Sequence, residues 1–374
     1  MKKQIVFVNQ SAGYLMIDII DAFKNDFEER VLLTGFLNSR NKKLDGTVKV
    51  EKLIAYNRSS SVKRIFTWFL GFLKAVYLIK CKYPKAHLFL VSNPPFTAWI
   101  PLLCKNSFDI LVYDIYPDAF VEFGYLQKDS RIIKKWEGIN RKVYDKARKI
   151  TTITDGMRER LTKYVNKDRV NVVPIWTDNS FLKPMPKSEN PFLKTHQIED
   201  KFIVMYSGNM GKSHHVEVIV DLALKCQGQS ELFFLLIGGG DKFKEMELLI
   251  QSYRLSNIKI LPWQDTSLLP FTLSGADLAL VTVGNEASDL SIPSKIYNLM
   301  SVGTPILCVA PIEAALSKLV SSENIGRVFE SNEIENVINF IMKCKNDREA
   351  YNKLSNNSLN LSLKFSCKNA QLLK

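Results

Sequence analysis

The residues best suited to chemistry stand in segment 285–305, around Lys295. A helical pattern begins there, with Ser291 as a candidate N-cap and Pro293 near the first helical position. A helix N-terminus offers free backbone N–H groups and the positive end of the helix dipole. Lys295 adds a full charge in the first turn, where the dipole repels it unless an anion is bound. The segment predicts a phosphate site; the alternative is a solvated lysine on an ordinary helix.

Two apolar runs flank this segment and must position it. The run 278–283 precedes it and the run 305–310 follows it. Strand, loop, helix and strand in this order build a parallel α/β sheet. Gln4–Val8, followed by a loop and a helical pattern, opens the chain in the same way. We therefore expect α/β architecture in both halves.

Small-residue turns follow two further predicted strands. The strand at 202–206 is followed by Ser-Gly-Asn-Met-Gly-Lys, and the strand at 233–237 by three glycines. Such turns let a phosphate approach the backbone. Neither turn has the spacing of a Walker A or a dinucleotide-binding motif. His214 and His215 open the next helix, and because neighbours on a helix point to different faces, they do not form a natural metal pair.

Two carboxylates flank a Tyr-Pro loop in the N-terminal half. Asp114 and Asp118 follow an apolar run at 110–113. The carboxyl ends of parallel strands are where α/β folds bind ligands. Asp114 and Asp118 are therefore candidate catalytic residues, and the alternative is a pair of turn-forming aspartates.

The length of 374 residues indicates two domains. We place an N-terminal domain at 1–180, a C-terminal domain at 181–350 and a helical tail at 351–374 that packs back towards the N-terminal domain. Six cysteines occur without C-x-x-C spacing, so neither zinc nor a disulfide framework is expected, which fits a reducing cytosol. The first apolar run is too short for a signal peptide.

The positive charge is confined to the first half of the chain. Residues 1–180 contain 31 Lys and Arg against 18 Asp and Glu, whereas residues 181–374 contain 20 of each. Residues 52–108 contain nine basic residues and no acidic one. The two halves are therefore expected to meet different partners.

An amphipathic stretch, 61–82, lies in this basic region. It combines aromatic and aliphatic residues with only positive charge, the composition of an interfacial helix on anionic lipid. Its apolar run, 65–79, is interrupted by Lys74 and is too short to span a bilayer, and the alternative is a core helix with solvated lysines. Nucleic-acid binding fits less well, because the region is rich in apolar and aromatic residues. The candidate membrane or acceptor contacts are Lys63, Arg64, Trp68, Phe72 and Lys74.

Taken in order, these motifs resemble the retaining glycosyltransferases of family 4, in the branch that assembles bacterial capsule, O-antigen and exopolysaccharide. The resemblance covers nearly the whole chain, and its motifs are weak singly but specific in this order. The matching segments are Ser-Asn-Pro-Pro at 92–95, Asp-Ile-Tyr-Pro-Asp at 114–118, Tyr-Ser-Gly-Asn-Met-Gly at 206–211, the glycines at 238–240, and 291–295 running to 303–305.

The resemblance implies the GT-B fold, with two Rossmann-like domains whose parallel sheets face a central cleft. It implies a nucleotide-sugar in the C-terminal domain and the acceptor in the N-terminal domain, near Gly13 and Asn93. Lys295 would balance the diphosphate leaving group, and the sugar would face Glu286 and Asp289 as catalytic candidates. The implied donor-binding residues are Gly208, Asn209, Gly211, Lys212, Gly239, Trp263, Ser294, Lys295 and Asn298.

The chain departs from the family pattern at two places. Asn298 stands where many members have the second of two glutamates, and Glu286 and Asp289 both fit the first. Asn209 and, roughly, His214 stand where many members have an arginine and a lysine. Which acidic residue touches the sugar is therefore left open by the sequence.

The resemblance implies a hexosyltransferase-type enzyme (EC 2.4) with a nucleotide-sugar donor and a lipid-linked saccharide acceptor in surface polysaccharide synthesis. The chain has no Asp-x-Asp, which metal-dependent transferases use, so we expect no metal and no cofactor. We expect a cytoplasmic protein held peripherally on the inner face of the cell membrane, with no nucleic-acid partner. Alternatives are a nucleotide-sugar epimerase of the same fold and a non-catalytic membrane-associated partner of a polysaccharide assembly complex.

Overall fold

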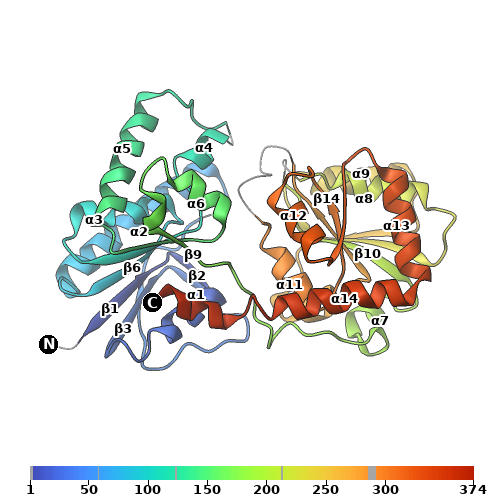
Figure 1. Ribbon diagram of the computed structural model, residues 1–374, viewed down its shortest axis with the longest axis horizontal. Coiled ribbons are helices and arrows are strands. Elements are labelled where there is room, and N and C mark those ends of the chain that lie inside the picture. Colours follow the sequence, from blue (N-terminus) through green and yellow to red (C-terminus); the bar gives the residue numbers. More distant parts are fainter. Residues whose placement is uncertain (1–2, 58, 123, 212–213, 285–291) are drawn as a thin grey trace. The chain divides into compact units, whose positions relative to one another are not determined.

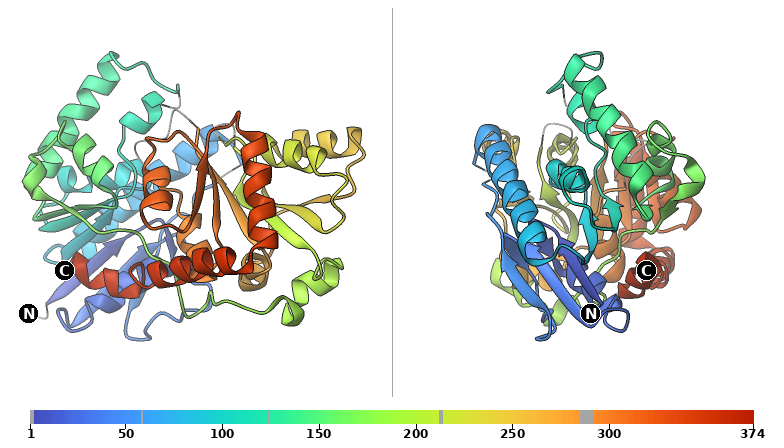
Figure 2. Two further views of the ribbon diagram at one scale, coloured as in Figure 1. Left: turned by 45° about the vertical axis from the view of Figure 1, so that its right-hand side comes forward. Right: turned by 90° about the vertical axis from the view of Figure 1, so that its left-hand side faces the viewer.

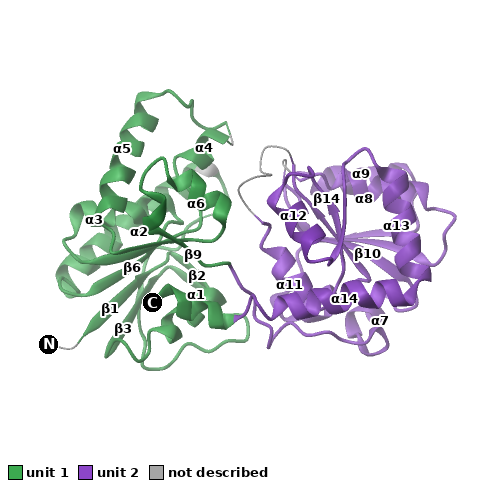
Figure 3. Cartoon of the chain, viewed as in Figure 1, with its two compact units in different colours: residues 1–174, 367–374 green, residues 175–366 purple. Residues whose placement is uncertain are grey.

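The structure is a computed structural model (Figure 1) that describes residues 3–57, 59–122, 124–211, 214–284 and 292–374. The chain forms two compact units (Figure 3). The first comprises residues 1–174 and 367–374, and the second residues 175–366. The chain therefore passes between the units twice, at 174/175 and at 366/367.

The first unit contains a seven-stranded, fully parallel sheet. Its strand order is β5-β3-β1-β6-β7-β8-β9, and a separate two-stranded sheet pairs β2 with β4. The strands are β1 Gln4–Val8, β2 Ser11–Gly13, β3 Glu29–Thr34, β4 Phe36–Asn38, β5 Lys49–Lys52, β6 His87–Val91, β7 Phe108–Val112, β8 Lys149–Thr152 and β9 Val170–Val172.

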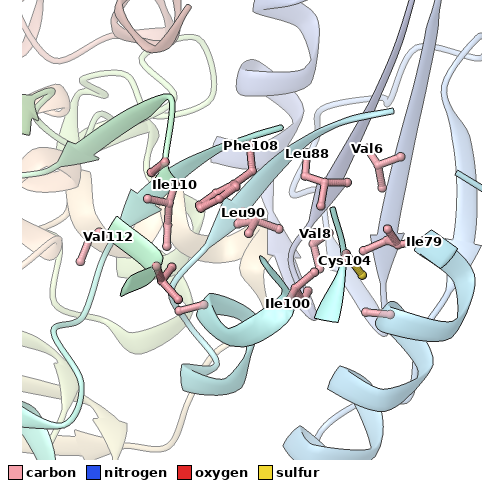
Figure 4. Close-up of a cluster of buried hydrophobic side chains, with 14 of the residues drawn as sticks. Val6, Val8, Ile79, Leu88, Leu90, Ile100, Cys104, Phe108, Ile110 and Val112 are labelled. Atoms are coloured by element: carbon pink, nitrogen blue, oxygen red, sulfur yellow. The ribbon is translucent and has the colours of Figure 1, made fainter. Parts of the chain in front are cut away.

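Helices cover both faces of this sheet, as a parallel sheet requires. Successive side chains of β1 point to opposite faces, so Val6 and Val8 join the core beneath α2 and α3 (Figure 4), while Phe7 packs against Phe23 and Phe89. The C-terminal 3₁₀ segment η6, Cys367–Leu373, packs against α1. The helices are α1 Tyr14–Ala22, α2 Ser61–Lys82, α3 Ile100–Leu103, α4 Asp118–Glu122, α5 Arg131–Lys146 and α6 Asp155–Leu161.

The second unit contains a six-stranded parallel sheet. Its order is β12-β11-β10-β13-β14-β15, so the strand sequence reverses direction between β10 and β13. The strands are β10 Phe202–Asn209, β11 Leu232–Gly239, β12 Ile258–Leu261, β13 Leu278–Thr282, β14 Ile306–Val309 and β15 Gly326–Phe329.

Two hydrophobic cores lie on the two faces of this sheet. Val204 and Tyr206 of β10 join the core under α8, α9 and α13, whereas Ile203 and Met205 join the core under α10, α11 and α12. Figure 2 shows α13 and α14 as the orange-red helices beside the sheet. The helices are α7 Pro191–His196, α8 Glu217–Lys225, α9 Phe243–Ser252, α10 Leu269–Ser274, α11 Lys295–Ser301, α12 Ala315–Ser322, α13 Ile334–Asn346 and α14 Arg348–Ser362.

The boundary between the units follows from burial rather than from composition. The Pro-containing segment 181–200, whose composition is typical of a linker, instead packs on the second unit, because Leu182 and Leu193 are fully buried in its core. Most of the expected tail behaves likewise. Helix α14 packs on α11 and α13, and only the last eight residues belong to the first unit.

The predicted helix at 61–82 is present with the same ends, as α2. The helix that carries Lys295 begins later than expected: α11 starts at Lys295, and Ser294 rather than Ser291 occupies its N-cap position. Ser294 makes no capping hydrogen bond through its side chain. Ser291 lies outside the described residues.

Candidate functional site

The second unit has a topological switch point between β10 and β13. In open parallel sheets, ligands bind outside the carboxyl ends of the strands at such a point. The segment after β10 begins with Gly208 and Asn209, and the segment after β13 leads towards α11. Most of the predicted donor-binding residues therefore gather at one edge of one sheet.

Glycines occupy paired positions at the carboxyl ends of β10 and β11. Gly208 pairs with Gly238, and both have positive φ, at 145° and 147°. A Cβ on Gly238 would overlap the carbonyl oxygen of Gly208. Only glycine combines this backbone conformation with such close approach. The sequence pattern of small residues thus reflects a tight backbone turn at the switch point.

Lys295 reaches this turn from the first position of α11. Its amino nitrogen is buried and has no hydrogen-bond partner among the described residues. The nitrogen lies 3.7 Å from the centre of the Tyr206 ring, and a Cβ on Gly208 would lie 3.6 Å from it. Burial lowers the pKa of Lys295 to about 7. A buried cation without a counter-ion is costly, so this geometry favours an anionic ligand.

His214 and Asn209 lie beside the same turn. A Cβ on Gly211 would lie 2.9 Å from Asn209 Nδ2 and 3.5 Å from His214 Nδ1. His214 Nδ1 is buried and also lacks a hydrogen-bond partner within the described ranges. Burial, together with the charge of Lys295, lowers the pKa of His214. The sequence indicated only that His214 stands roughly where many family members have a lysine. The structure adds that its ring nitrogen faces this turn.

Trp263 borders the other side of the glycine turn. It follows β12, and a Cβ on Gly239 would lie 2.8 Å from its indole nitrogen. The side chain is nevertheless 62% exposed. An exposed aromatic plane beside bare backbone suits stacking on a flat ring such as a nucleobase.

Asn298 lies one turn after Lys295 on α11 and is held by a residue that the sequence did not single out. The hydroxyl of Thr177 donates to Asn298 Oδ1 at 2.6 Å, across 121 positions of sequence. No local pattern reveals such a pair. Ser294 is exposed at the start of α11. Three predicted residues, Lys212, Glu286 and Asp289, lie outside the described residues.

In the first unit, the switch point lies between β1 and β6. Gly13 ends β2, just after β1, and Asn93 follows β6. The amide of Asn93 donates to Asp114 Oδ2 at 2.7 Å, and Ser92 Oγ accepts from the backbone N–H of Asp114 at 3.2 Å. Burial raises the pKa of Asp114, although the Asn93 hydrogen bond opposes the shift. The structure therefore brings Asn93 and Asp114 together.

Asp118 has different partners. Lys163 donates to its Oδ1 at 3.0 Å, and the Tyr164 hydroxyl donates to its Oδ2. These contacts join the start of α4 to residues that follow α6. They give Asp118 a structural task, and its catalytic role stays a prediction.

The amphipathic helix α2 presents a different face from the one the sequence suggested. Trp68 and Phe72 are buried in the unit's core, at 7% and 9% exposure, and are not surface contacts. Helical periodicity turns the intervening positions outward. Lys63 is exposed, Lys74 is half-buried, and the guanidinium of Arg64 lies 5.4 Å from the centre of the Trp68 ring. The exposed apolar residues of α2 are Val62, Ile65, Phe66, Phe69, Leu73 and Tyr77.

Within the described ranges, no helix combines the length and apolar character needed to cross a membrane. The described residues also include no cluster of three His, Cys, Asp or Glu side chains able to hold a metal ion.

The part of the chain that carries Lys295 is similar to known proteins. Residues 189–360 match the family "Glycosyl transferases group 1". The match covers most of the second unit, so this part of the chain is similar to that family. It includes the glycine turn, Trp263 and α11.

A curated relative extends the likeness. The chain is 28% identical over 221 residues to "Probable glycosyltransferase WbjE" of Pseudomonas aeruginosa. The alignment covers 58% of this chain and 54% of WbjE. The chain thus spans about half the length of this relative.

Solved structures establish the fold. Anabaena Alr3699/HepE in complex with UDP and glucose has a TM-score of 0.72 and 15% identity, covering 99% of this chain and 97% of HepE. WaaG, a glycosyltransferase involved in lipopolysaccharide biosynthesis, has a TM-score of 0.67 and 12% identity, covering 99% of each chain. The chain therefore has two Rossmann-like domains with parallel sheets, as the GT-B expectation required.

Proposed function

We propose that the protein is a glycosyltransferase of hexosyltransferase type, which moves a sugar from a nucleotide-diphosphate donor to a lipid-linked saccharide acceptor. The observation that carries the proposal is the amino nitrogen of Lys295, which is buried at the glycine turn of the second unit and has no hydrogen-bond partner among the described residues. The family match of this unit and the UDP complex of HepE support a nucleotide-sugar donor.

The donor diphosphate binds where Lys295 lies against the bare backbone of Gly208. Its negative charge compensates the buried ammonium group of Lys295, and backbone N–H groups of the turn donate to phosphate oxygens. As the glycosidic bond breaks, charge grows on the leaving diphosphate, so a fixed cation there stabilises the transition state more than the ground state. The reaction is proposed to be metal-independent and retaining, because Lys295 itself supplies this charge and the sequence resembles retaining enzymes.

The acceptor is proposed to bind the first unit beside Asp114. A carboxylate with a raised pKa is a stronger base than an ordinary aspartate, and it could accept the proton of an attacking hydroxyl. Asn93 fixes its orientation by the 2.7 Å hydrogen bond. Glu286 and Asp289 remain the candidates for contact with the donor sugar.

The outer face of α2 supports a lipid-linked acceptor. Six exposed apolar side chains share this helix with lysines, and Leu102 and Leu103 of the neighbouring α3 are also exposed. Residues 52–108 carry no acidic side chain. Apolar side chains ringed by positive charge suit the surface of an anionic bilayer. The protein is therefore proposed to act at the inner face of the cell membrane in surface polysaccharide synthesis, as the names of the related proteins suggest.

The test is donor binding without divalent metal. Thermal unfolding is measured with UDP, GDP, CDP and their sugars for wild type, Lys295→Met and Lys318→Met, whose exposed lysine pairs with Glu313. We expect one diphosphate to stabilise wild type and Lys318→Met by about 2.7 kcal/mol at 100 times its Kd, and Lys295→Met much less. Failure of every nucleotide to stabilise wild type would overturn the proposal and favour a non-catalytic membrane partner. Interconversion of two free nucleotide-sugars would favour the epimerase.

A further inference from the structure

A hydrogen bond from the segment that enters the second unit holds the side chain of Asn298 on α11. Thr177 is the third residue of the second unit, and its side chain is fully buried. Its hydroxyl donates to Asn298 Oδ1 at 2.6 Å, and its backbone N–H donates to Phe365 O at 3.2 Å. Phe365 stands next to the point where the chain leaves the unit. One residue therefore joins both crossing segments to α11.

The Thr177 contact decides which polar atom of Asn298 is available. An amide side chain has one accepting oxygen and one donating nitrogen. Because Oδ1 accepts from Thr177, the oxygen side of the amide faces Thr177 and Nδ2 lies on the opposite side, where it forms no hydrogen bond within the described part of the chain. Nδ2 can only donate, so its partner must be an accepting oxygen.

Asn298 shares a face of α11 with Lys295, because residues three apart on a helix are neighbours. We infer that Thr177 is a positioning residue for the donor: it locks the Asn298 amide so that Nδ2 donates to an oxygen of the bound nucleoside diphosphate. The inference rests on the proposed function and adds a specific contact to it. A carboxylate at position 298 could not make this contact, since it has no proton to donate.

The chain offers a matched control on the same helix. Ser301 Oγ, also buried, donates to Leu182 O at 2.7 Å, so it too ties α11 to the segment that enters the unit. Ser301→Ala and Thr177→Val each remove one buried hydroxyl that donates across this contact. Only Thr177→Val releases the Asn298 amide.

The experiment measures UDP affinity by calorimetry, with GDP and CDP as further probes, for wild type and single variants. We expect Thr177→Val and Asn298→Ala each to weaken binding about tenfold, as the loss of one hydrogen bond to a charged or polar oxygen implies. Thr177→Ser should restore wild-type affinity, and Asn298→Asp should bind at least as weakly as Asn298→Ala. Ser301→Ala should lower the melting temperature as Thr177→Val does, yet stay within about twofold of wild-type affinity.

A double-mutant cycle separates positioning from mere stability. If Thr177 acts through Asn298, both substitutions remove the same contact between Asn298 and the nucleotide. The double variant then binds about tenfold rather than a hundredfold more weakly than wild type. Independent, multiplying effects would overturn the inference, as would equal affinity losses in Thr177→Val and Ser301→Ala. Absence of nucleotide binding to wild type is a different result: it overturns the proposed function, and this inference with it.

Discussion

Lys295 holds its amino nitrogen 3.7 Å from the centre of the Tyr206 ring, so that a cation from α11 rests on an aromatic face from β10. A cation over a ring gains about 0.5–2 kcal/mol. Removing an ammonium group from water costs several kcal/mol. The ring therefore offsets only part of the desolvation, so burial favours the neutral amine.

This balance makes stability depend on pH. The pKa of Lys295 falls from its usual 10.5 to about 7 in the folded chain. Between these values the unfolded chain holds a proton that the folded chain does not, so Lys295 makes the unfolding free energy rise with pH, by at most about 1.4 kcal/mol per unit. Lys295→Met should be more stable than wild type at pH 7, with a gap that closes towards pH 10.5. Urea unfolding across this range checks it, and a gap independent of pH would show that Lys295 is paired.

Donor affinity should change with pH in the opposite sense. The diphosphate binds the ammonium form of Lys295, so above pH 7 binding must take up a proton. UDP affinity should therefore fall as pH rises from 7 to 9, by at most about tenfold per unit. His214, whose pKa burial also lowers, would add to this fall if it is protonated on binding. Calorimetry in buffers of different ionisation enthalpy measures the protons directly, and the uptake should be smaller in Lys295→Met. Equal proton uptake in wild type and Lys295→Met would show that the proton binds to a group other than Lys295.

The two candidate aspartates should behave differently when each is changed to asparagine. Asp114→Asn keeps an acceptor for Asn93 but removes the base, so kcat should fall about 100-fold or more with UDP affinity unchanged. Asp118→Asn weakens the contacts with Lys163 and Tyr164, so it should cost about 1–3 kcal/mol of stability and leave kcat of the folded enzyme within a few fold. Steady-state kinetics and urea unfolding of both variants decide this. A reversal of the two outcomes would move the base to Asp118.

Membrane binding should depend on the outer face of α2. Phe66→Asp replaces a side chain that is 60% exposed, and Phe36→Asp makes the same change at a 57% exposed site on β4. We expect Phe66→Asp to weaken binding to vesicles containing phosphatidylglycerol by about tenfold or more, because burying a phenyl ring is worth about 1.5–3 kcal/mol. Phe36→Asp should bind like wild type. Co-sedimentation measures both, and identical binding of the two variants would remove α2 from the contact.

The glycine turn should tolerate no side chain. In Gly238→Ala the new Cβ would overlap Gly208 O, and the residue would need φ near 147°. We expect a loss of at least about 2 kcal/mol in unfolding free energy. Gly228→Ala is the control, since a Cβ there meets nothing within 4 Å, and it should change stability by less than about 0.5 kcal/mol. Urea midpoints report both, and a mild Gly238→Ala would mean that β10 and β11 separate easily.

The sequence by itself determined the alternation of strands and helices, the ends of α2, and the place of Lys295 in the first turn of a helix. Each of these is a local property. Apolar runs mark buried strands, a 3.6-residue period marks a helix, and a lysine at a helix start conflicts with the dipole without reference to any distant residue. The resemblance to glycosyltransferases rested on the same short motifs, and the fold agrees with it.

The tertiary structure decided what depends on distant partners. The composition of 61–82 suggested that Trp68 and Phe72 contact the membrane. In the folded chain both are buried, and Phe66 is exposed instead. Asp118 and Asp114 were equivalent catalytic candidates in the sequence, but in the folded chain Lys163 donates to the carboxylate of Asp118. Thr177 gave no signal at all, because its partner, Asn298, is 121 residues away. Hydrogen bonds and burial between remote segments arise only when the chain is folded, so local residue patterns cannot show which side chains they leave free for a ligand.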